Sequence, residues 1–187
     1  MDKSFYTEDE IKILGLKSYG ENVLISRFAR IYDAGNITIG NNVRVDDFVL
    51  LSGKLKIGNF VHIAAYTALY GKSGITIEDF CNISARVLIY SVSDDYSGEV
   101  LTNPTIPDEY SSPILGMVYL SKHVIVGAGS VILPGVTAGE GVAIGALSMV
   151  NRDLEPWNIY GGVPVRLIKK RSKKLLDLER ALLDETF

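Results

Sequence analysis

Aliphatic side chains recur at every sixth position along most of the chain. The first clear series is Ile39, Val45, Leu51, Ile57, Ile63 and Leu69, and after a two-residue insertion it continues at Ile77, Ile83 and Ile89. It returns after a longer break as Leu120, Val126, Ile132, Ala138, Ile144 and Val150, and a fainter set precedes it at Tyr19, Ile25 and Ile31. An α-helix has an apolar period of about 3.6 and an ordinary strand alternates, so neither explains a period of six.

A short strand and a turn, repeated as one side of a three-sided coil, do produce this period. Three hexapeptides then form one coil of about 18 residues, with the aliphatic side chains stacked inside. Small residues follow many aliphatic positions, where a larger side chain would crowd the corner; examples are Gly40, Gly58, Ala64, Ser84, Gly127 and Gly145. We expect about six coils between Tyr19 and Asn151. A β-sandwich is the alternative, but its strands do not keep phase over so many repeats.

The two ends of the chain have the character of caps on a single domain. Thr7-Glu8-Asp9-Glu10 matches a capping box and predicts a short N-terminal helix. In the tail, Leu175, Leu178 and Leu182 form one helical stripe, which we expect to pack on this chain or on a sister subunit. The predicted parts are an N-terminal cap at 1–18, a β-helix at 19–151, a loop insertion within it at 90–119, and a C-terminal segment with a helix at 152–187.

Composition narrows the possible functions. The net charge of −3 argues against a nucleic-acid partner, which needs a basic face. No apolar run approaches the roughly 20 residues of a membrane-spanning helix, and the polar start MDKSFYTEDE does not resemble a secretory signal. The single cysteine, Cys81, cannot form an internal disulfide, so we expect a cytoplasmic protein. Two histidines and one cysteine leave no recognisable zinc motif, so no metal is expected.

The most specific pattern begins at His123, with HVIVGAGSVILPGVTAGEG followed by VAIGALSMVNRDL and then YGGVPVRLI. On this ordered series the chain resembles the hexapeptide-repeat acyltransferases, above all the maltose, galactoside and xenobiotic acetyltransferase branch. The resemblance implies a left-handed parallel β-helix, a homotrimer and acyl-CoA clefts between subunits. The implied activity is direct transfer from acetyl-CoA to a hydroxyl or amino group of a sugar or nucleotide sugar, as in surface polysaccharide or O-antigen pathways. The alternative is a non-catalytic β-helix with a structural or binding role.

The resemblance also indicates where acetyl-CoA would bind. Phosphates require cations, and the pantetheine arm requires exposed backbone beside small side chains. The matching wall positions are Ala128 and Ala146, and those at the nucleotide end are Asn151, Arg152, Arg166 and Lys169. Among these we expect Arg152 and Arg166 to hold phosphates.

The acceptor site departs from its relatives. Galactoside and maltose enzymes carry a catalytic histidine at the start of the inserted loop, and by resemblance this place falls at or beside Asp94. The sequence has Ser93-Asp94-Asp95 there and no histidine in the loop. The resemblance places His62 on the cleft side of a corner, and we predict that it is the general base, with Asp94 or Asp95 orienting it or binding the acceptor. The alternative is a structural corner histidine. Asn82, stacked one coil above His62, or backbone N–H groups would stabilise the oxyanion.

Three further residues bear on the chemistry. Cys81 falls at an inward position, so no covalent acyl-enzyme is expected, and we interpret His123 as a surface turn residue. Polar acceptor residues of the galactoside enzymes correspond here to Ala64 and Lys72, which disfavours a plain galactoside. Because an amine is itself a nucleophile and needs less activation than an alcohol, the site is compatible with an amino sugar.

Overall fold

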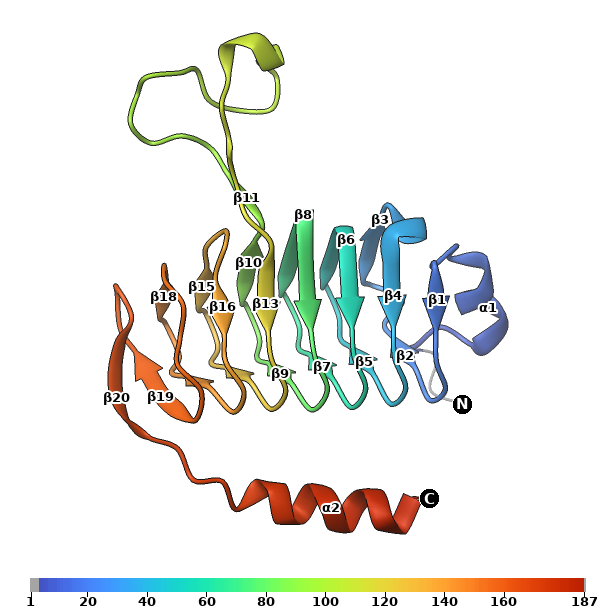
Figure 1. Cartoon of the computed structure of the whole chain (residues 1–187). Coiled ribbons are helices and arrows are strands. Elements are labelled where there is room, and N and C mark those ends of the chain that lie inside the picture. Colours follow the sequence, from blue (N-terminus) through green and yellow to red (C-terminus); the bar gives the residue numbers. More distant parts are fainter. Residues whose placement is uncertain (1–3, 187) are drawn as a thin grey trace.

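The computed structural model describes residues 4–186 and forms a solenoid of three-sided coils stacked along one axis (Figure 1). One side is an eight-stranded sheet, parallel throughout except for its last pair. Its strands are, in order, β2 (Leu24–Ile25), β5 (Arg44–Val45), β7 (His62–Ile63), β9 (Asn82–Ile83), β14 (Ile125–Val126), β17 (Ala143–Ile144), β19 (Asn158–Gly161) and β20 (Arg166–Lys170). Because β19 pairs in parallel with β17, the β-helix extends beyond its predicted end at Asn151.

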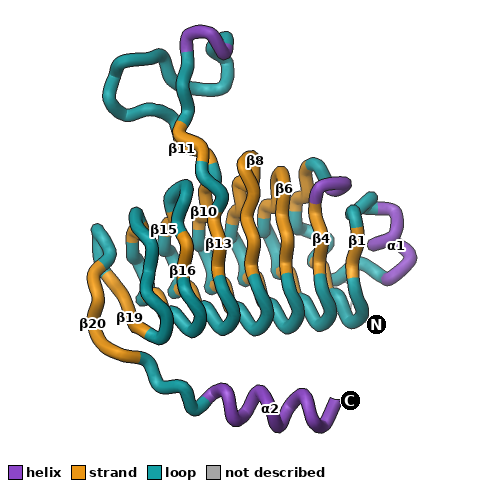
Figure 2. Tube along the Cα trace, in the orientation of Figure 1, coloured by secondary structure: helices purple, strands orange, loops and turns teal. Residues whose placement is uncertain are grey.

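A ten-stranded parallel sheet forms the other two sides (Figure 2). Its strands are β1 (Ser18–Tyr19), β3 (Arg30–Tyr32), β4 (Ile37–Ile39), β6 (Leu50–Ile57), β8 (Ala68–Ile77), β10 (Leu88–Tyr90), β13 (Val118–Leu120), β15 (Val131–Ile132), β16 (Thr137–Ala138) and β18 (Met149–Val150). Strands β6 and β8 are long enough to pass through a corner, so β6 pairs with both β3 and β4 and joins the two sides. A 3₁₀ turn, η1 (Ala34–Asn36), precedes β4.

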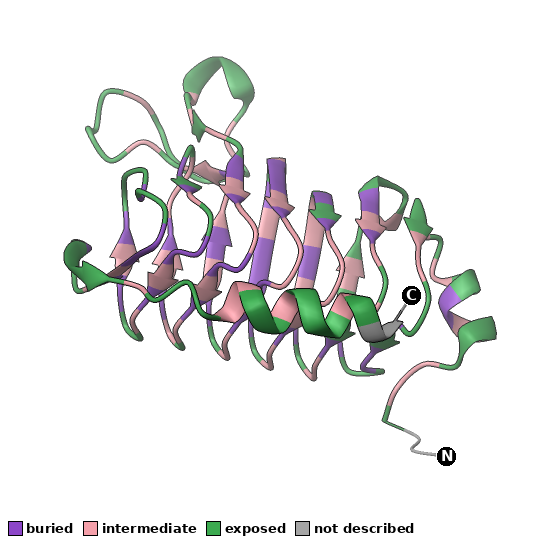
Figure 3. Ribbon diagram, turned by 60° about the horizontal axis from the view of Figure 1, so that its bottom comes forward, coloured by how far each residue is buried: buried purple, intermediate pink, exposed green. Residues whose placement is uncertain are grey.

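The six-residue repeat supplies the core. Leu51, Ile63, Leu69 and Ile89 are fully buried, and buried residues run through the strands along the solenoid (Figure 3). Removing such a side chain from water contributes about 1.5–3 kcal/mol, so stability accumulates coil by coil. The stacked parallel strands confirm the predicted left-handed parallel β-helix.

The long break in the repeat is a loop that leaves one corner after β10 and returns at β13. Its root is a short antiparallel pair of β11 (Val92–Ser93) and β12 (Ile114–Leu115), and a 3₁₀ turn, η2 (Asp108–Tyr110), lies farther out. Figure 1 shows the loop standing away from the coils. The insertion predicted at 90–119 is thus a defined projection whose root is fixed to the β-helix.

The N-terminal cap forms as its sequence predicts. Helix α1 (Glu8–Ile13) begins after Thr7, whose backbone N–H donates to the Glu10 carboxylate at 2.8 Å. The Thr7 hydroxyl accepts from the Glu10 backbone N–H, which completes the capping box. Ile11 is buried against the first coil and anchors the helix there.

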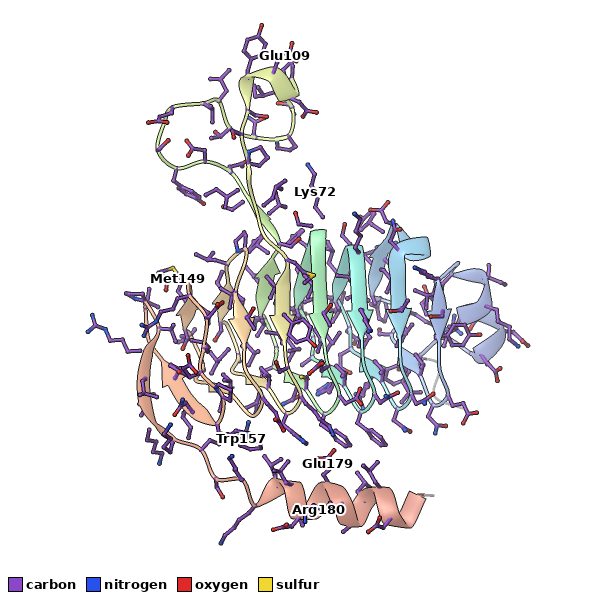
Figure 4. The ribbon with its side chains drawn as sticks, in the orientation of Figure 1. Lys72, Glu109, Met149, Trp157, Glu179 and Arg180 are labelled. Carbon is purple, nitrogen blue, oxygen red and sulfur yellow. The ribbon has the colours of Figure 1, made fainter. Side chains whose placement is uncertain are left out.

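The C-terminal helix lies along a corner of the β-helix, and Glu179 lies on the side of the helix that faces the coils (Figure 4). In α2 (Leu175–Thr186), Leu178 is 73% exposed and Leu182 is also exposed, whereas Leu175 is half-buried, so most of the predicted leucine stripe is open on the outer face of the helix. The less exposed positions are Leu175, Leu176, Glu179 and Leu183. Glu179 makes polar contacts with Lys122 and His123 of the β-helix, and these contacts fix which face of α2 turns inward.

His123 is buried, contrary to the prediction of a surface turn residue. It has the left-handed backbone conformation of a turn, with φ of 63°, but only 6% of it is exposed. Its ring stacks on Phe80 with centroids 5.3 Å apart, and its Nε2 lies 2.8 Å from Glu179 Oε2. Burial alone would raise the pKa of Glu179, but hydrogen bonds from Lys122 and His123 lower it below its ordinary value. The prediction was wrong because the covering helix comes from a distant part of the chain.

Candidate active site

A cavity of about 770 Å³ lies between the root of the inserted loop and the coils, and we call it the loop pocket. The coils contribute Tyr70, Lys72, Tyr90, Val131 and Leu133, and the loop contributes Val92, Ser93, Asp94, Tyr96, Asn103, Pro104, Ile106, Asp108, Ser111 and Pro113. Hydroxyl, amide and charged groups thus share the cavity with apolar walls. This composition suits a polar ligand with hydroxyl groups and flat faces.

Asp94 has the most available carboxylate of the predicted site residues. Within residues 4–186 its side chain makes neither a hydrogen bond nor an ion pair, and the residue is exposed where it lines the loop pocket. Nearby, the rings of Tyr70 and Tyr90 stack with centroids 5.0 Å apart, and burial raises the pKa of Tyr90. Asp94 is therefore a carboxylate ready to bind a cation beside two aromatic rings.

Asp95 serves the loop itself. Its carboxylate accepts hydrogen bonds from the Ser97 hydroxyl at 2.7 Å and from the Gly98 backbone N–H at 3.1 Å. The Ser97 hydroxyl is the main cause of the lowered pKa of Asp95. The residue closes a local turn and does not line the loop pocket.

His62 lies on β7, with both ring nitrogens engaged. Its Nδ1 lies 3.0 Å from Asn82 Oδ1 and its Nε2 lies 2.8 Å from Asp46 Oδ2. Arg44 Nε donates to the other Asp46 oxygen at 2.6 Å. Burial acts to raise the pKa of Asp46, but the hydrogen bonds from Arg44 and His62 outweigh it and the pKa is lowered. We call these four residues the His62 cluster.

The expected stacking of Asn82 on His62 is present, but the expected contact with the loop carboxylates is not. The cavity beside His62 is lined by Asn42, Arg44, Asp46, Phe60 and Val61, and it is separate from the loop pocket. Within one chain, Asp46 takes the place that the prediction gave to Asp94 or Asp95. A His62 that acts as a base would first have to release one of its two present partners.

Three of the predicted donor-binding residues come together at the far end of the β-helix. Asn151, Arg152 and Arg166 line a cavity of about 340 Å³ with Pro164 and Val165, which we call the arginine pocket.

Lys169 lies outside the lining of that pocket, on the exposed strand β20. Ala128 and Ala146 are exposed at one corner in adjacent coils, which a hydrogen bond from Leu147 N to Ala128 O joins at 2.9 Å.

Known proteins resemble this chain over nearly its whole length. A dTDP-4-amino-4,6-dideoxy-D-glucose acyltransferase of Escherichia coli is 48% identical over 179 residues, which cover 94% of this chain and 93% of the relative. The chain belongs to the hexapeptide-repeat sugar acyltransferases. It is accordingly an enzyme that transfers acyl groups. No family model matches the sequence.

Solved structures of an N-acyltransferase superpose closely on this chain. AntD, an N-acyltransferase from Bacillus cereus, superposes in its D94A variant with dTDP and coenzyme A at a TM-score of 0.96 and 55% identity, covering 97% of this chain and 98% of AntD. Its S84C variant, in complex with dTDP-4-amino-4,6-dideoxyglucose and coenzyme A, superposes at a TM-score of 0.97 and 54% identity. This match covers 99% of this chain and 100% of AntD. The galactoside O-acetyltransferase of Escherichia coli is 30% identical over 71% of this chain and 63% of its own length.

The sequence predictions missed several polar residues of these sites. Tyr70 and Tyr90 directly follow the inward residues Leu69 and Ile89, so equivalent repeat positions already indicated that their rings would stack. Asp46 occupies the repeat position that Ala64 and Ser84 occupy in the next two coils. This position directly follows β5, the strand that pairs with the strand of His62.

The one cysteine of the chain lies in the core. Cys81 is buried, and burial raises its pKa to about 12, as expected for a core residue and not for a nucleophile. Residues 4–186 contain no group of three or more His, Cys, Asp or Glu side chains arranged to hold a metal ion. Neither helix described by the structure has the length and apolar character to cross a membrane.

Proposed function

We propose that the enzyme transfers an acyl group from acyl-CoA, acetyl-CoA in the simplest case, to the amino group of a dTDP-linked 4-amino-4,6-dideoxy sugar. The observation that carries the proposal is the unpaired carboxylate of Asp94 in a pocket whose loop has no histidine. A carboxylate attracts an ammonium group and holds it in place. The relatives support this choice, because AntD variants carry substitutions named D94A and S84C, and this chain also has aspartate at 94 and serine at 84.

The proposed reaction is a direct attack on the thioester. The ammonium group first gives a proton to Asp94. The lone pair of the resulting amine nitrogen then forms a bond to the acyl carbon, and the bond from that carbon to sulfur breaks. The nitrogen loses a proton, and the departing thiolate of coenzyme A finally takes one up. We assign to Asp94, instead of His62, the position beside the amine, because both His62 nitrogens are already engaged.

Asn82 keeps its predicted role at the oxyanion only as a hypothesis. Its Oδ1 is held by His62, so its amide N–H groups are the donors that this role would use. Since the cavity beside His62 is separate from the loop pocket in one chain, the role further requires a neighbouring subunit to bring the two together.

The donor would lie with its phosphates in the arginine pocket and its arm directed toward the loop pocket. Ile132 pairs with Val150, so Leu133 of the loop pocket and Asn151 of the arginine pocket follow each other in adjacent coils. Adjacent strands are about 4.8 Å apart, a short step for the pantetheine arm. In this proposal Arg152 and Arg166 bind phosphates, with Lys169 near them, and the arm passes Ala128 and Ala146.

We further propose that the enzyme is a homotrimer whose clefts are completed by a neighbouring subunit. The separation of the His62 cluster from the loop pocket and the exposed Leu178 both support an assembly of several chains. The acylated sugar would serve surface polysaccharide synthesis, and the reaction would occur in the cytoplasm, where acyl-CoA and nucleotide sugars are made.

An acceptor comparison tests the proposed function. The purified protein is incubated with acetyl-CoA and dTDP-4-amino-4,6-dideoxyglucose, and release of the coenzyme A thiol is followed together with the product mass. We expect stoichiometric N-acetylation. The matched control is the dTDP sugar with a hydroxyl in place of the 4-amino group, which we expect to react far more slowly. Equal rates for both acceptors would contradict the proposal, and no turnover of either would favour the non-catalytic alternative.

A further inference from the structure

The loop pocket contains a lysine that the proposed chemistry does not use. Lys72 extends from the middle of β8 toward the root of the loop, and Figure 4 shows its side chain directed upward. It forms no ion pair or side-chain hydrogen bond within residues 4–186, although Asp94 and Asp108 line the same cavity. The loop pocket thus holds one basic and two acidic side chains, and Lys72 forms an ion pair with neither aspartate.

The backbone that carries Lys72 is fixed by its neighbours. Ser91 is fully buried, and its hydroxyl donates to the Tyr70 carbonyl and accepts from the Ser73 N–H, each at 2.9 Å. On the other side the chain packs on Gly53, where an added Cβ would lie 2.9 Å from the backbone nitrogen of Lys72. Because Ser91 directly precedes β11, Lys72 is held at a set place relative to the loop root.

Separated charges of this kind complement a zwitterion. A nucleotide-linked amino sugar carries an ammonium group on the sugar and two negative charges on the diphosphate. Lysine is a common point-charge ligand for phosphate, and the hydroxyls of Tyr70 and Tyr90 in the same pocket suit the sugar between the two charged ends. A free amino sugar would satisfy Asp94 and leave Lys72 without a partner.

We propose that Lys72 binds the diphosphate of the acceptor and thereby selects nucleotide-linked over free amino sugars. The inference rests on the proposed function for the identity of the acceptor. Coenzyme A also carries phosphates, but the arginine pocket, with two arginines, is the site that fits them. The two sources of phosphate are separated by measuring donor and acceptor independently.

The test uses calorimetric binding of dTDP and of coenzyme A, followed by kinetics with both acceptors. Lys72→Met should weaken dTDP binding roughly 10- to 100-fold and raise the KM of the nucleotide sugar by a similar factor. Binding of coenzyme A and turnover of free 4-amino-4,6-dideoxyglucose should change less than about twofold, and Lys72→Arg should retain most dTDP binding. Lys54→Met is the matched control, since Lys54 is exposed one coil earlier and lies outside the pocket.

Equal dTDP binding by the wild type and Lys72→Met would overturn the inference, as would a loss confined to coenzyme A. A wild type that binds no dTDP would contradict both this inference and the proposed acceptor. A wild type that binds dTDP through Lys72, yet acylates no amino sugar, would leave the inference standing and remove the proposed function.

Discussion

The His62 cluster and the loop pocket are both polar, yet they differ in what their reactive atoms already contact. His62 has a partner on each ring nitrogen, and Asp46 is hydrogen-bonded to both Arg44 and His62. The side chains of Asp94 and Lys72 form no hydrogen bond or ion pair within residues 4–186. A satisfied network holds strands in place, whereas unpaired charges on a fixed backbone are available to a ligand. The difference moves the expected chemistry from the histidine to the loop.

The largest expected effect on the reaction rate comes from substitution of Asp94, which tests the loop pocket. Asp94→Asn keeps the shape of the side chain and removes the charge that holds the ammonium group and accepts its proton. We expect kcat/KM for the amino sugar to fall by about 10²–10⁴-fold, measured by thiol release at saturating acetyl-CoA. Asp95→Asn is the control and should stay near wild type, because that carboxylate only closes a turn. Similar losses in both variants would indicate a general disturbance of the loop.

The arginine pocket should give a smaller effect that is confined to the donor. Arg166→Ala removes one charge-assisted contact, which costs about 1.5–3 kcal/mol and should raise the KM for acetyl-CoA roughly 10- to 100-fold. The KM for the acceptor should not change. A donor truncated to its pantetheine part should react equally with the wild type and with Arg166→Ala, because it carries no phosphate that Arg166 could contact. An equal loss for all donors would contradict a phosphate contact.

Substitutions in the His62 cluster should affect the stability of the protein more than its reaction rate. His62→Asn removes hydrogen bonds that together contribute on the order of 1 kcal/mol, so the Tm should fall by a few degrees. If the cluster is structural, kcat should stay within about threefold of wild type. A drop of more than tenfold, with unchanged Tm and acetyl-CoA affinity, would restore the original hypothesis that His62 is the general base.

The smallest effect concerns the other satisfied network, which joins α2 to His123. The lowered pKa of Glu179 means that its contribution to docking of the helix is present above its ordinary pKa of about 4.3 and is lost as the pH falls through the lowered value. Trp157 is the only tryptophan of the chain, its ring lies beside His123, and Lys173 lies over it. Its fluorescence should therefore shift below about pH 4. Glu179→Gln should shift it already at neutral pH, while a flat profile in both proteins would exclude this role.

The repeat made the coils predictable because each position has an identical environment in the next coil. Ile63 and Ile83 had to be inward and in register, and the stacking of His62 on Asn82 followed from the same count. The gathering of Asn151, Arg152 and Arg166 could be predicted only from family resemblance. Asn151 and Arg152 precede β19, whereas Arg166 begins β20, outside the six-residue repeat.

Contacts outside the repeat were not predictable in this way. Glu179 reaches His123 across 56 positions, and no periodicity connects the two segments. The loop conformation that leaves Asp94 open and closes Asp95 on Ser97 depends on local turns within an aperiodic stretch. The partner of His62 was misassigned for a similar reason: Asp46 belongs to the preceding coil, and the prediction considered only the loop acids.

The central claim is that the amino group of the acceptor meets Asp94 and not His62. A crystal structure of this enzyme with coenzyme A and dTDP-4-amino-4,6-dideoxyglucose tests it most directly, through the distance from the sugar nitrogen to each residue. The account predicts a separation of about 2.7–3.2 Å from an Asp94 carboxylate oxygen, with Asp46 still bonded to His62. A sugar nitrogen bonded to His62, with the Asp46 contact open and Asp94 out of reach, would contradict it.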